Sequence, residues 1–293
     1  MQDPMNSSIA QVLMFSLMLG MGLALTVQDF RRVLSVRAPV LTGMVLQFFL
    51  MPVVGGALAI LFDLPPLLAL GMVVCGALPG GAGSNLLVHF GRANTALSIT
   101  LTATATFGAL FTLPLWIRGT QSWIGADAEA VVVPILDTAL QLGMLTVLPV
   151  GLGMLVRDRY PGAENYERRV TGISGLALLG VMIWDTADQP EAPLALLEEV
   201  FWPVLCLALL GTVVGVVVPR LLGQTLEDAV TIAIELCVKN VLLGMVVLAS
   251  AFPQIDPNVP LFVYSGVMMP AALVLLAGFR ARIRSLGSGA GPT

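Results

Sequence analysis

The third apolar stretch of the chain contains the sequence Gly-Ala-Leu-Pro-Gly-Gly-Ala-Gly-Ser-Asn at residues 76–85. One proline and four glycines thus interrupt a run that is otherwise long and apolar enough to cross a bilayer as a helix. At membrane depth, backbone without helical hydrogen bonds is tolerated only where it is buried in protein or lines a wet cavity. The stretch therefore predicts a broken membrane helix whose break faces the interior of a helical bundle.

The composition favours a membrane protein. Of the 293 residues, 57% are hydrophobic and 11% are charged, and ordinary soluble domains have about 25% charged residues. The mean hydropathy of +0.93 implies more apolar surface than a soluble globule can bury. The net charge of -4 and the lack of basic patches with interleaved aromatic residues give no footprint for nucleic acid. We therefore expect an all-α membrane protein, not a soluble enzyme or a nucleic-acid-binding module.

Nine apolar runs of about 20 residues, the length that crosses a hydrocarbon core, are separated by short polar or Pro/Gly-marked turns. The predicted spans are 9–27, 39–61, 66–88, 95–117, 132–156, 170–187, 200–219, 228–251 and 261–279. We expect one transmembrane domain over residues 1–284. The Gly/Ser-rich tail that follows, residues 285–293, is predicted to be disordered.

The distribution of arginine predicts the orientation, because cytoplasmic loops collect Lys and Arg. One set of alternate loops holds twelve of the fourteen Lys+Arg residues, including Arg168 and Arg169. The opposite set holds only Arg118, and the remaining cation, Lys239, lies within a span. The N-terminus is therefore predicted outside and the C-terminus inside.

The cysteines and the histidine do not suggest a metal site. Cys75, Cys206 and Cys237 all fall within apolar stretches, which suits free thiols packed as small hydrophobes. His89 is the only histidine, so no zinc constellation is available. It falls at the inner end of the third span, and we interpret it as an ordinary interfacial histidine.

The eighth span carries Glu235, Lys239 and Asn240 near mid-membrane. Ionisable groups at this depth are costly unless they are paired, so these residues are functional candidates. Spans three and eight are each the penultimate helix of their half, which is the placement expected of inverted repeats in a secondary transporter. We therefore predict a polar site at the interface of the two repeats, where the two broken helices meet.

Each candidate also has a purely structural interpretation. Glu235 and Lys239 are four residues apart and could form a buried ion pair that holds two helices in register. The Gly/Pro stretch could permit close helix packing. Ser98 and Thr102, also four residues apart, could form hydrogen bonds between helices, and Gln47 could do the same.

Two consecutive motifs carry a resemblance to a known family. They are Pro-Gly-Gly-Ala-Gly-Ser-Asn at residues 79–85 and Gly-Arg-Ala-Asn-Thr-Ala-Leu-Ser-Ile-Thr-Leu-Thr at residues 91–102. Weaker matches lie at residues 20–25, 29–30, 47–48 and 51–52. Over nearly its whole length the chain resembles the bile acid:sodium symporter family, whose members carry organic anions. It looks like a nine-helix form with its N-terminus outside, and the resemblance implies an integral protein of a bacterial inner (plasma) membrane.

The resemblance implies a panel domain and a core domain, in which spans three and eight cross at their broken centres. It assigns one sodium ion to oxygen-bearing residues, namely Ser84, Asn85, Ser98, Thr102 and Glu235. A second sodium ion is implied at Glu235, Gln47, backbone carbonyls near residues 236 and 238, and a glutamine at the position of Lys239. The chain departs from the family at this last position.

We hypothesise that the ammonium of Lys239 replaces the second sodium ion, because its charge would repel a cation bound beside it. The carrier would then couple transport to one sodium ion, or Lys239 would lose its proton during the cycle and couple transport to protons. The expected substrate is an organic anion, bile-acid-like or a small carboxylate. Asn85, Asn240, Lys239 and the N–H groups at half-helix N-termini are the expected donors to it, and Gln47 and Glu235 complete the coupling residues.

Two other function classes stay open at this point. An intramembrane hydrolase could use Ser84 or Ser98 as nucleophile and Lys239 as base, although Glu235 one turn earlier would keep the amine protonated. A receptor-like protein or scaffold could have kept the fold and lost transport. Besides a substrate and the lipid bilayer, we expect no obligate protein partner.

Overall fold

The computed structural model describes residues 4–32, 37–124, 140, 143–160, 162–187, 193–251 and 258–288. Within these ranges the secondary structure is helical, and the one β-type contact is an isolated antiparallel bridge between Gly80 and Lys239. The predicted all-α class is confirmed for this part of the chain.

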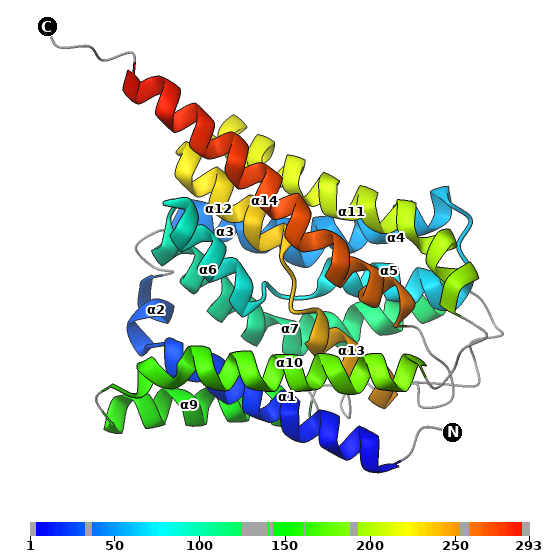
Figure 1. The fold of residues 1–293 in the computed structure, drawn as a ribbon. Helices are drawn as coiled ribbons and strands as arrows, with labels where there is room; N and C mark the ends of the chain where they lie inside the picture. The colour runs from blue at the N-terminus through cyan, green and yellow to red at the C-terminus, as the bar shows by residue number, and fades with distance from the viewer. Residues whose placement is uncertain are drawn as a thin grey trace, which may run out of the picture.

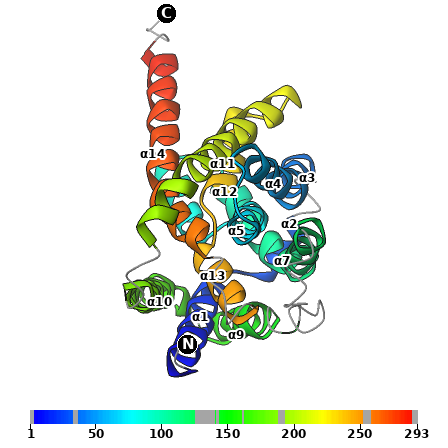
Figure 2. The same cartoon turned by 90° about the vertical axis from the view of Figure 1, so that its right-hand side faces the viewer.

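Three helices form a layer of their own (Figures 1 and 2). They are α1 (Pro4–Ala24), α9 (Leu148–Arg159) and α10 (Glu167–Ala187). Helix α1 packs against both α9 and α10, and we call this group the three-helix layer. Short helical turns η3 (Gly143–Val147) and η4 (Ala163–Tyr166) precede α9 and α10.

The larger group of helices lies above the three-helix layer in the views of Figures 1 and 2. It comprises α3 (Arg37–Val45), η1 (Leu46–Leu50), α4 (Met51–Leu61), α5 (Pro66–Ala77), α6 (Ala82–Gly91), α7 (Thr95–Ile124), α11 (Pro193–Leu221), α12 (Leu226–Cys237), α13 (Val241–Ala251) and α14 (Val259–Ser288). The short helix α2 (Val27–Arg32) follows α1 and contacts α7.

Four continuous helical stretches in the described ranges are long and apolar enough to cross a membrane. They are Arg37–Leu61, Thr95–Thr120, Leu197–Leu221 and Val259–Arg282. Large apolar side chains on these helices stay uncovered by protein, for example Phe111 at 71% and Val274 at 74% exposure. Such apolar surface suits contact with lipid chains, and the chain is an integral membrane protein.

The two predicted breaks are present. Helix α5 ends at Ala77 and α6 begins at Ala82, while α12 ends at Cys237 and α13 begins at Val241. The backbone between them is buried, as predicted for the first break.

The predicted fifth span, 132–156, lies partly outside the described residues, and its described end contains η3 and α9. Helix α14 continues to Ser288, so residues 285–288 of the predicted disordered tail are helical, and residues 289–293 lie outside the description. Adding a turn to an existing helix needs no new nucleation, which explains why the Gly/Ser composition did not stop it at residue 284.

A proline reshapes the helix that carries Gln47. Pro52 has no N–H to donate, so the carbonyl four residues earlier, that of Phe48, loses its helical partner. The chain responds with the π-helical turn η1, and the indole N–H of Trp116 donates to the Phe48 carbonyl at 2.8 Å. This interhelical hydrogen bond satisfies the freed acceptor and ties η1 to α7.

Candidate functional site

The two broken helices cross through their main chains. The Gly81 N–H donates to the Val238 carbonyl at 3.0 Å, and the Asn240 N–H donates to the Pro79 carbonyl at 2.8 Å. This short antiparallel pairing supplies partners to backbone groups that have left their helices. It therefore fixes the four half-helix ends around one point.

Side chains satisfy the ends of three half-helices at the crossing. The Lys239 ammonium donates to the Leu78 carbonyl at 3.0 Å and to the Gly76 carbonyl at 3.4 Å, at the C-terminus of α5. The Tyr264 hydroxyl donates to the Cys237 carbonyl at 2.9 Å, at the C-terminus of α12. At the N-terminus of α13, Asn240 Oδ1 accepts from the Leu243 N–H at 3.3 Å. The charge of Lys239 lies where a helix dipole favours a cation.

Next to the crossing, hydroxyl groups from α6 and α7 converge on the carboxylate of Glu235 in α12. Ser84 Oγ and Ser98 Oγ lie 2.6 and 2.5 Å from Oε1, and Thr102 Oγ1 lies 2.9 Å from Oε2. Ser98 Oγ is also 2.7 Å from Asn85 Oδ1. We call these five residues the Glu235 cluster; it unites side chains that are up to 151 positions apart in the chain.

The close approach of the carboxylate requires a glycine. A Cβ atom at Gly80 would collide with Glu235 Oε2 and would contact Ser84 Oγ at 3.6 Å. The Glu235 side chain is 1% exposed, so it has no open space into which to retreat. The site therefore requires a residue without a side chain at position 80.

Lys239 and Glu235 interact electrostatically, but within the described chain no direct ion pair joins them. The ammonium is bonded to backbone carbonyls and the carboxylate to hydroxyls. Lys239 is 2% exposed, so both charges are removed from water. The arrangement differs from the simple i, i+4 ion pair considered from the sequence. The Lys239 amine is bonded to backbone carbonyls, and the serine hydroxyls are bonded to Glu235. A serine–lysine hydrolase needs the amine and the hydroxyl bonded to each other.

The remaining predicted residues are not joined to the Glu235 cluster by a hydrogen bond. Gln47 is buried in η1, which packs against α5 and α7, and its Nε2 has no partner in the described part of the chain. Asn240 Nδ2 is likewise buried without a partner there. These amide groups retain donor capacity beside the crossing helices.

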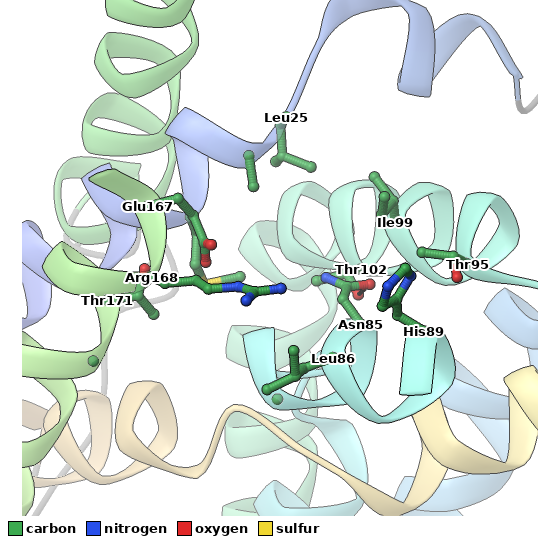
Figure 3. Close-up of a pocket in the computed structure, with 14 residues that line it drawn as sticks. Leu25, Asn85, Leu86, His89, Thr95, Ile99, Thr102, Glu167, Arg168 and Thr171 are labelled. Atoms are coloured by element: carbon green, nitrogen blue, oxygen red, sulfur yellow. Dashed lines mark hydrogen bonds between the residues drawn. The ribbon is translucent and has the colours of Figure 1, made fainter. Parts of the chain in front are cut away.

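A cavity of about 430 Å³ opens between the two groups of helices (Figure 3). The three-helix layer lines it with Met21, Ala24, Leu25, Glu167, Arg168, Thr171 and Gly172. The larger group lines it with Gly83, Asn85, Leu86, His89, Thr95, Ile99 and Thr102. Asn85 and Thr102 thus belong both to the Glu235 cluster and to the cavity wall.

Sequence reasoning missed the charged residues of this cavity. Arg168 was one of twelve arginines assigned to inner loops, and nothing in its sequence context distinguishes it from Arg169. His89, which the sequence predicts at the inner interface, also lines the cavity. Partial burial raises the pKa of the Glu167 carboxyl above its usual value, while neighbouring Arg168 and Thr171 oppose the rise. The sequence alone does not reveal these residues, because they line a common cavity only where α10 lies opposite α6 in the folded structure.

The Glu235 cluster has the chemistry of a site for a hard monovalent cation. Its donors are three hydroxyl oxygens, an amide oxygen and one carboxylate, and one negative charge matches one positive ion. Among the described residues, no cluster of three or more His, Cys, Asp or Glu could hold a metal ion. In the part of the chain that the structure describes, such a cluster beside two crossed, broken helices is the arrangement found in many secondary transporters.

Comparison with known proteins specifies this class. Residues 11–187 match the Sodium Bile acid symporter family. Because the match covers more than half of the sequence, the chain belongs to this family. The family and the relatives described next are transporters and not enzymes, which confirms the expectation from the sequence.

Three relatives illustrate the similarity. "Probable sodium/metabolite cotransporter BASS1, chloroplastic" of Oryza sativa subsp. japonica is 30% identical over 261 residues, which cover 88% of this chain and 63% of that protein. "Ileal sodium/bile acid cotransporter" of Oryctolagus cuniculus is 27% identical over 259 residues, 85% and 72% of the two chains. "Uncharacterized sodium-dependent transporter YocS" of Bacillus subtilis (strain 168) is 26% identical over 263 residues, 88% and 79%. The aligned region spans less than two thirds of the plant relative.

Proposed function

We propose that this protein is a secondary active transporter that carries an organic anion across the membrane together with sodium, by alternating access. The single observation that carries the proposal is the convergence of Ser84, Ser98 and Thr102 on the buried carboxylate of Glu235. The names of the relatives, which include sodium/bile acid and sodium/metabolite cotransporters, point to the same activity.

The proposed coupling ion is one sodium ion in the Glu235 cluster. A carboxylate that is 1% exposed needs compensation for its lost hydration, and a cation among five oxygen-bearing side chains would supply it. Each hydroxyl would turn its lone pairs to the ion instead of its proton to the carboxylate. Asn85 and Thr102 also face the cavity, so the bound ion would lie directly behind the substrate.

Lys239 is proposed to stand in for a second sodium ion. Its ammonium already binds the carbonyls of Gly76 and Leu78 and places one positive charge at the crossing. A second free cation beside it would meet electrostatic repulsion at low dielectric. The proposal is therefore a one-sodium symporter with a tethered cation, in a nine-helix arrangement of two inverted repeats with the N-terminus outside.

Transport assays test the function. The purified protein is reconstituted in proteoliposomes, and uptake of 2-oxobutanoate, pantoate and cholate is measured with and without an inward sodium gradient. We expect sodium to stimulate uptake of at least one acid, and Glu235→Gln to reduce that stimulation about tenfold or more, because the amide cannot compensate the ion's charge.

The matched control is Glu227→Gln, an exposed glutamate two turns earlier on the same helix, which should behave as the parent. Uptake that is equally fast with potassium in place of sodium, or sodium stimulation that survives Glu235→Gln, would contradict sodium coupling at this cluster.

A second candidate is a sodium-independent carrier coupled to protons through Lys239. The observation that favours it is that the described structure gives the buried ammonium only backbone carbonyls as hydrogen-bond partners, so no direct ion pair holds its proton. In this case a pH gradient would drive uptake without sodium, and Lys239→Gln would abolish the effect of pH.

A further inference from the structure

The turn between α6 and α7 is tied to helix α12 by a second set of hydrogen bonds, apart from the Glu235 cluster. Asn94, the residue before α7, donates from Nδ2 to Asp228 Oδ1 at 2.7 Å and from its backbone N–H to Thr231 Oγ1 at 3.0 Å. Its Oδ1 accepts from the Leu97 N–H at 3.0 Å and so caps α7. Asn94 therefore joins the start of α7 to the start of α12 through both its side chain and its main chain.

These contacts lie one helical turn before the Glu235 cluster on both helices. Ser98 follows Asn94 by four residues on α7, and Glu235 follows Thr231 by four residues on α12. Residues four apart lie on the same face of a helix. The contact between Asn94 and Thr231 and the contact between Ser98 and Glu235 are therefore successive steps of one interface, along which α7 and α12 run in the same direction.

The register of α7 against α12 decides whether the oxygens of the cluster can meet around one ion. Helix α7 supplies Ser98 and Thr102, and α12 supplies Glu235. A binding constellation must be held to within roughly 0.5 Å, which is a small fraction of the ~5.4 Å pitch of a helix. When the hydroxyls turn their lone pairs to a bound ion, their hydrogen bonds to the carboxylate are lost. The contacts of Asn94 use none of these hydroxyls, so they hold the register with and without the ion.

We propose that Asn94 is a positioning residue for the coupling ion. Through its hydrogen bonds to Asp228 and Thr231, it fixes the position of α7 along α12 and thereby the affinity of the Glu235 cluster for sodium. The inference rests on the proposed sodium coupling and adds a residue that does not itself touch the ion. Residues that orient metal ligands from behind typically change metal affinity about 10- to 100-fold when they are replaced.

An exchange of the two side chains separates this role from simple capping of α7. Asn94→Asp keeps the oxygen that caps α7, but it loses the Nδ2 donor and places a carboxylate against that of Asp228. The double variant Asn94→Asp/Asp228→Asn restores the hydrogen bond with donor and acceptor exchanged. Asp228→Asn alone keeps an oxygen acceptor for Asn94 and should behave as the parent. Glu227→Gln removes the charge of an exposed neighbour on α12 and is the matched control.

Sodium affinity is measured on the full chain in detergent, without any substrate. The melting temperature is followed as sodium chloride replaces potassium chloride at constant ionic strength, because a ligand of the folded state raises it in proportion to its affinity. We expect Asn94→Asp to raise the half-maximal sodium concentration about tenfold, and the double variant to return it to within about threefold of the parent. The added negative charge of Asn94→Asp would by itself strengthen cation binding, so weaker binding reports a change of position and not of charge.

The outcomes separate this inference from the function on which it rests. If sodium stabilises the parent no more than potassium does, or stabilises Glu235→Gln equally, sodium coupling at the cluster fails and the inference fails with it. If the parent binds sodium and Asn94→Asp binds it as tightly or more tightly, only the inference fails.

Two further results would also overturn the role of Asn94. One is a double variant that binds sodium as weakly as Asn94→Asp does. The other is a lower melting temperature of Asn94→Asp with unchanged sodium affinity, which would make Asn94 a structural contact only. Should Asn94→Asp not fold, Asp228→Ala removes the acceptor from the opposite side of the same hydrogen bond. Parental sodium affinity in Asp228→Ala then overturns the inference.

Discussion

At the scale of single residues, Lys239 is a cation buried at the crossing of the broken helices. Its ammonium lies at the C-terminal end of α5 and donates to two carbonyls that the helix break has released. A buried cation is stable only with such partners, and the broken helix provides them without any acidic side chain. Lys239 therefore places its positive charge at the crossing itself.

Replacing Lys239 by glutamine should restore a second sodium site. In Lys239→Gln, the released carbonyls and the new amide oxygen would accept a cation, so the Hill coefficient of uptake against sodium concentration should rise from about 1 toward 2. Lys239→Arg keeps the charge and serves as the control, which should retain the parental coefficient. If the sodium dependence of Lys239→Gln matches that of the parent, the replacement hypothesis is wrong.

At the scale of elements, the crossing of α5–α6 with α12–α13 depends on neighbours that satisfy its open ends. Tyr264 on α14 is fully buried, and its hydroxyl donates to the last carbonyl of α12 at 2.9 Å. Trp116 does the same for the carbonyl released by Pro52. Side chains on α14 and α7 thus donate to main-chain carbonyls that have no partner within their own helix.

Removal of the Tyr264 hydroxyl should destabilise the crossing. Tyr264→Phe leaves the buried Cys237 carbonyl without this donor, at a cost of about 1–3 kcal/mol, and should lower the melting temperature of the detergent-solubilised protein by several degrees. Tyr160→Phe, which changes a tyrosine that is 68% exposed, is the control and should melt as the parent does. Equal melting temperatures for the two variants would contradict a stabilising role for this hydrogen bond.

At the scale of the whole molecule, the two helix groups enclose a cavity, and the side from which it is reached depends on the orientation in the membrane. The cavity wall includes the start of α10, which follows loop residues of the arginine-rich set. With the predicted orientation, N-terminus outside, this conformation opens to the cytoplasm. This orientation is proposed from the arginine-rich loops, because such loops resist translocation.

Cysteine labelling in intact cells tests the orientation. Asn165→Cys, in the exposed turn before α10, should react with a membrane-impermeant maleimide only after permeabilisation, whereas Phe62→Cys, between α4 and α5, should react in intact cells. Both are made in a Cys206→Ala background, because Cys75 and Cys237 are buried and Cys206 is partly accessible. The reverse labelling pattern would invert the proposed topology.

The sequence allowed some of these features to be predicted and concealed others for physical reasons. The break at residues 76–85 could be predicted because a cluster of proline and glycine interrupts the helical hydrogen bonds. The Glu235 cluster followed from family resemblance, since hydroxyl residues at helical spacing are common in membrane helices. The partners of Lys239 were not predictable, because backbone carbonyls have no sequence signature. Arg168 was not separable from Arg169, because only the packing of α10 opposite α6 places it in the cavity wall.

The pairing of Gly81 with Val238 and of Asn240 with Pro79 uses only atoms that every peptide unit offers, apart from proline's missing N–H. These two hydrogen bonds therefore do not depend on the side chain at position 239. If Lys239 replaces a sodium ion as proposed, one substitution at position 239 changes the ion that powers transport and needs no new scaffold.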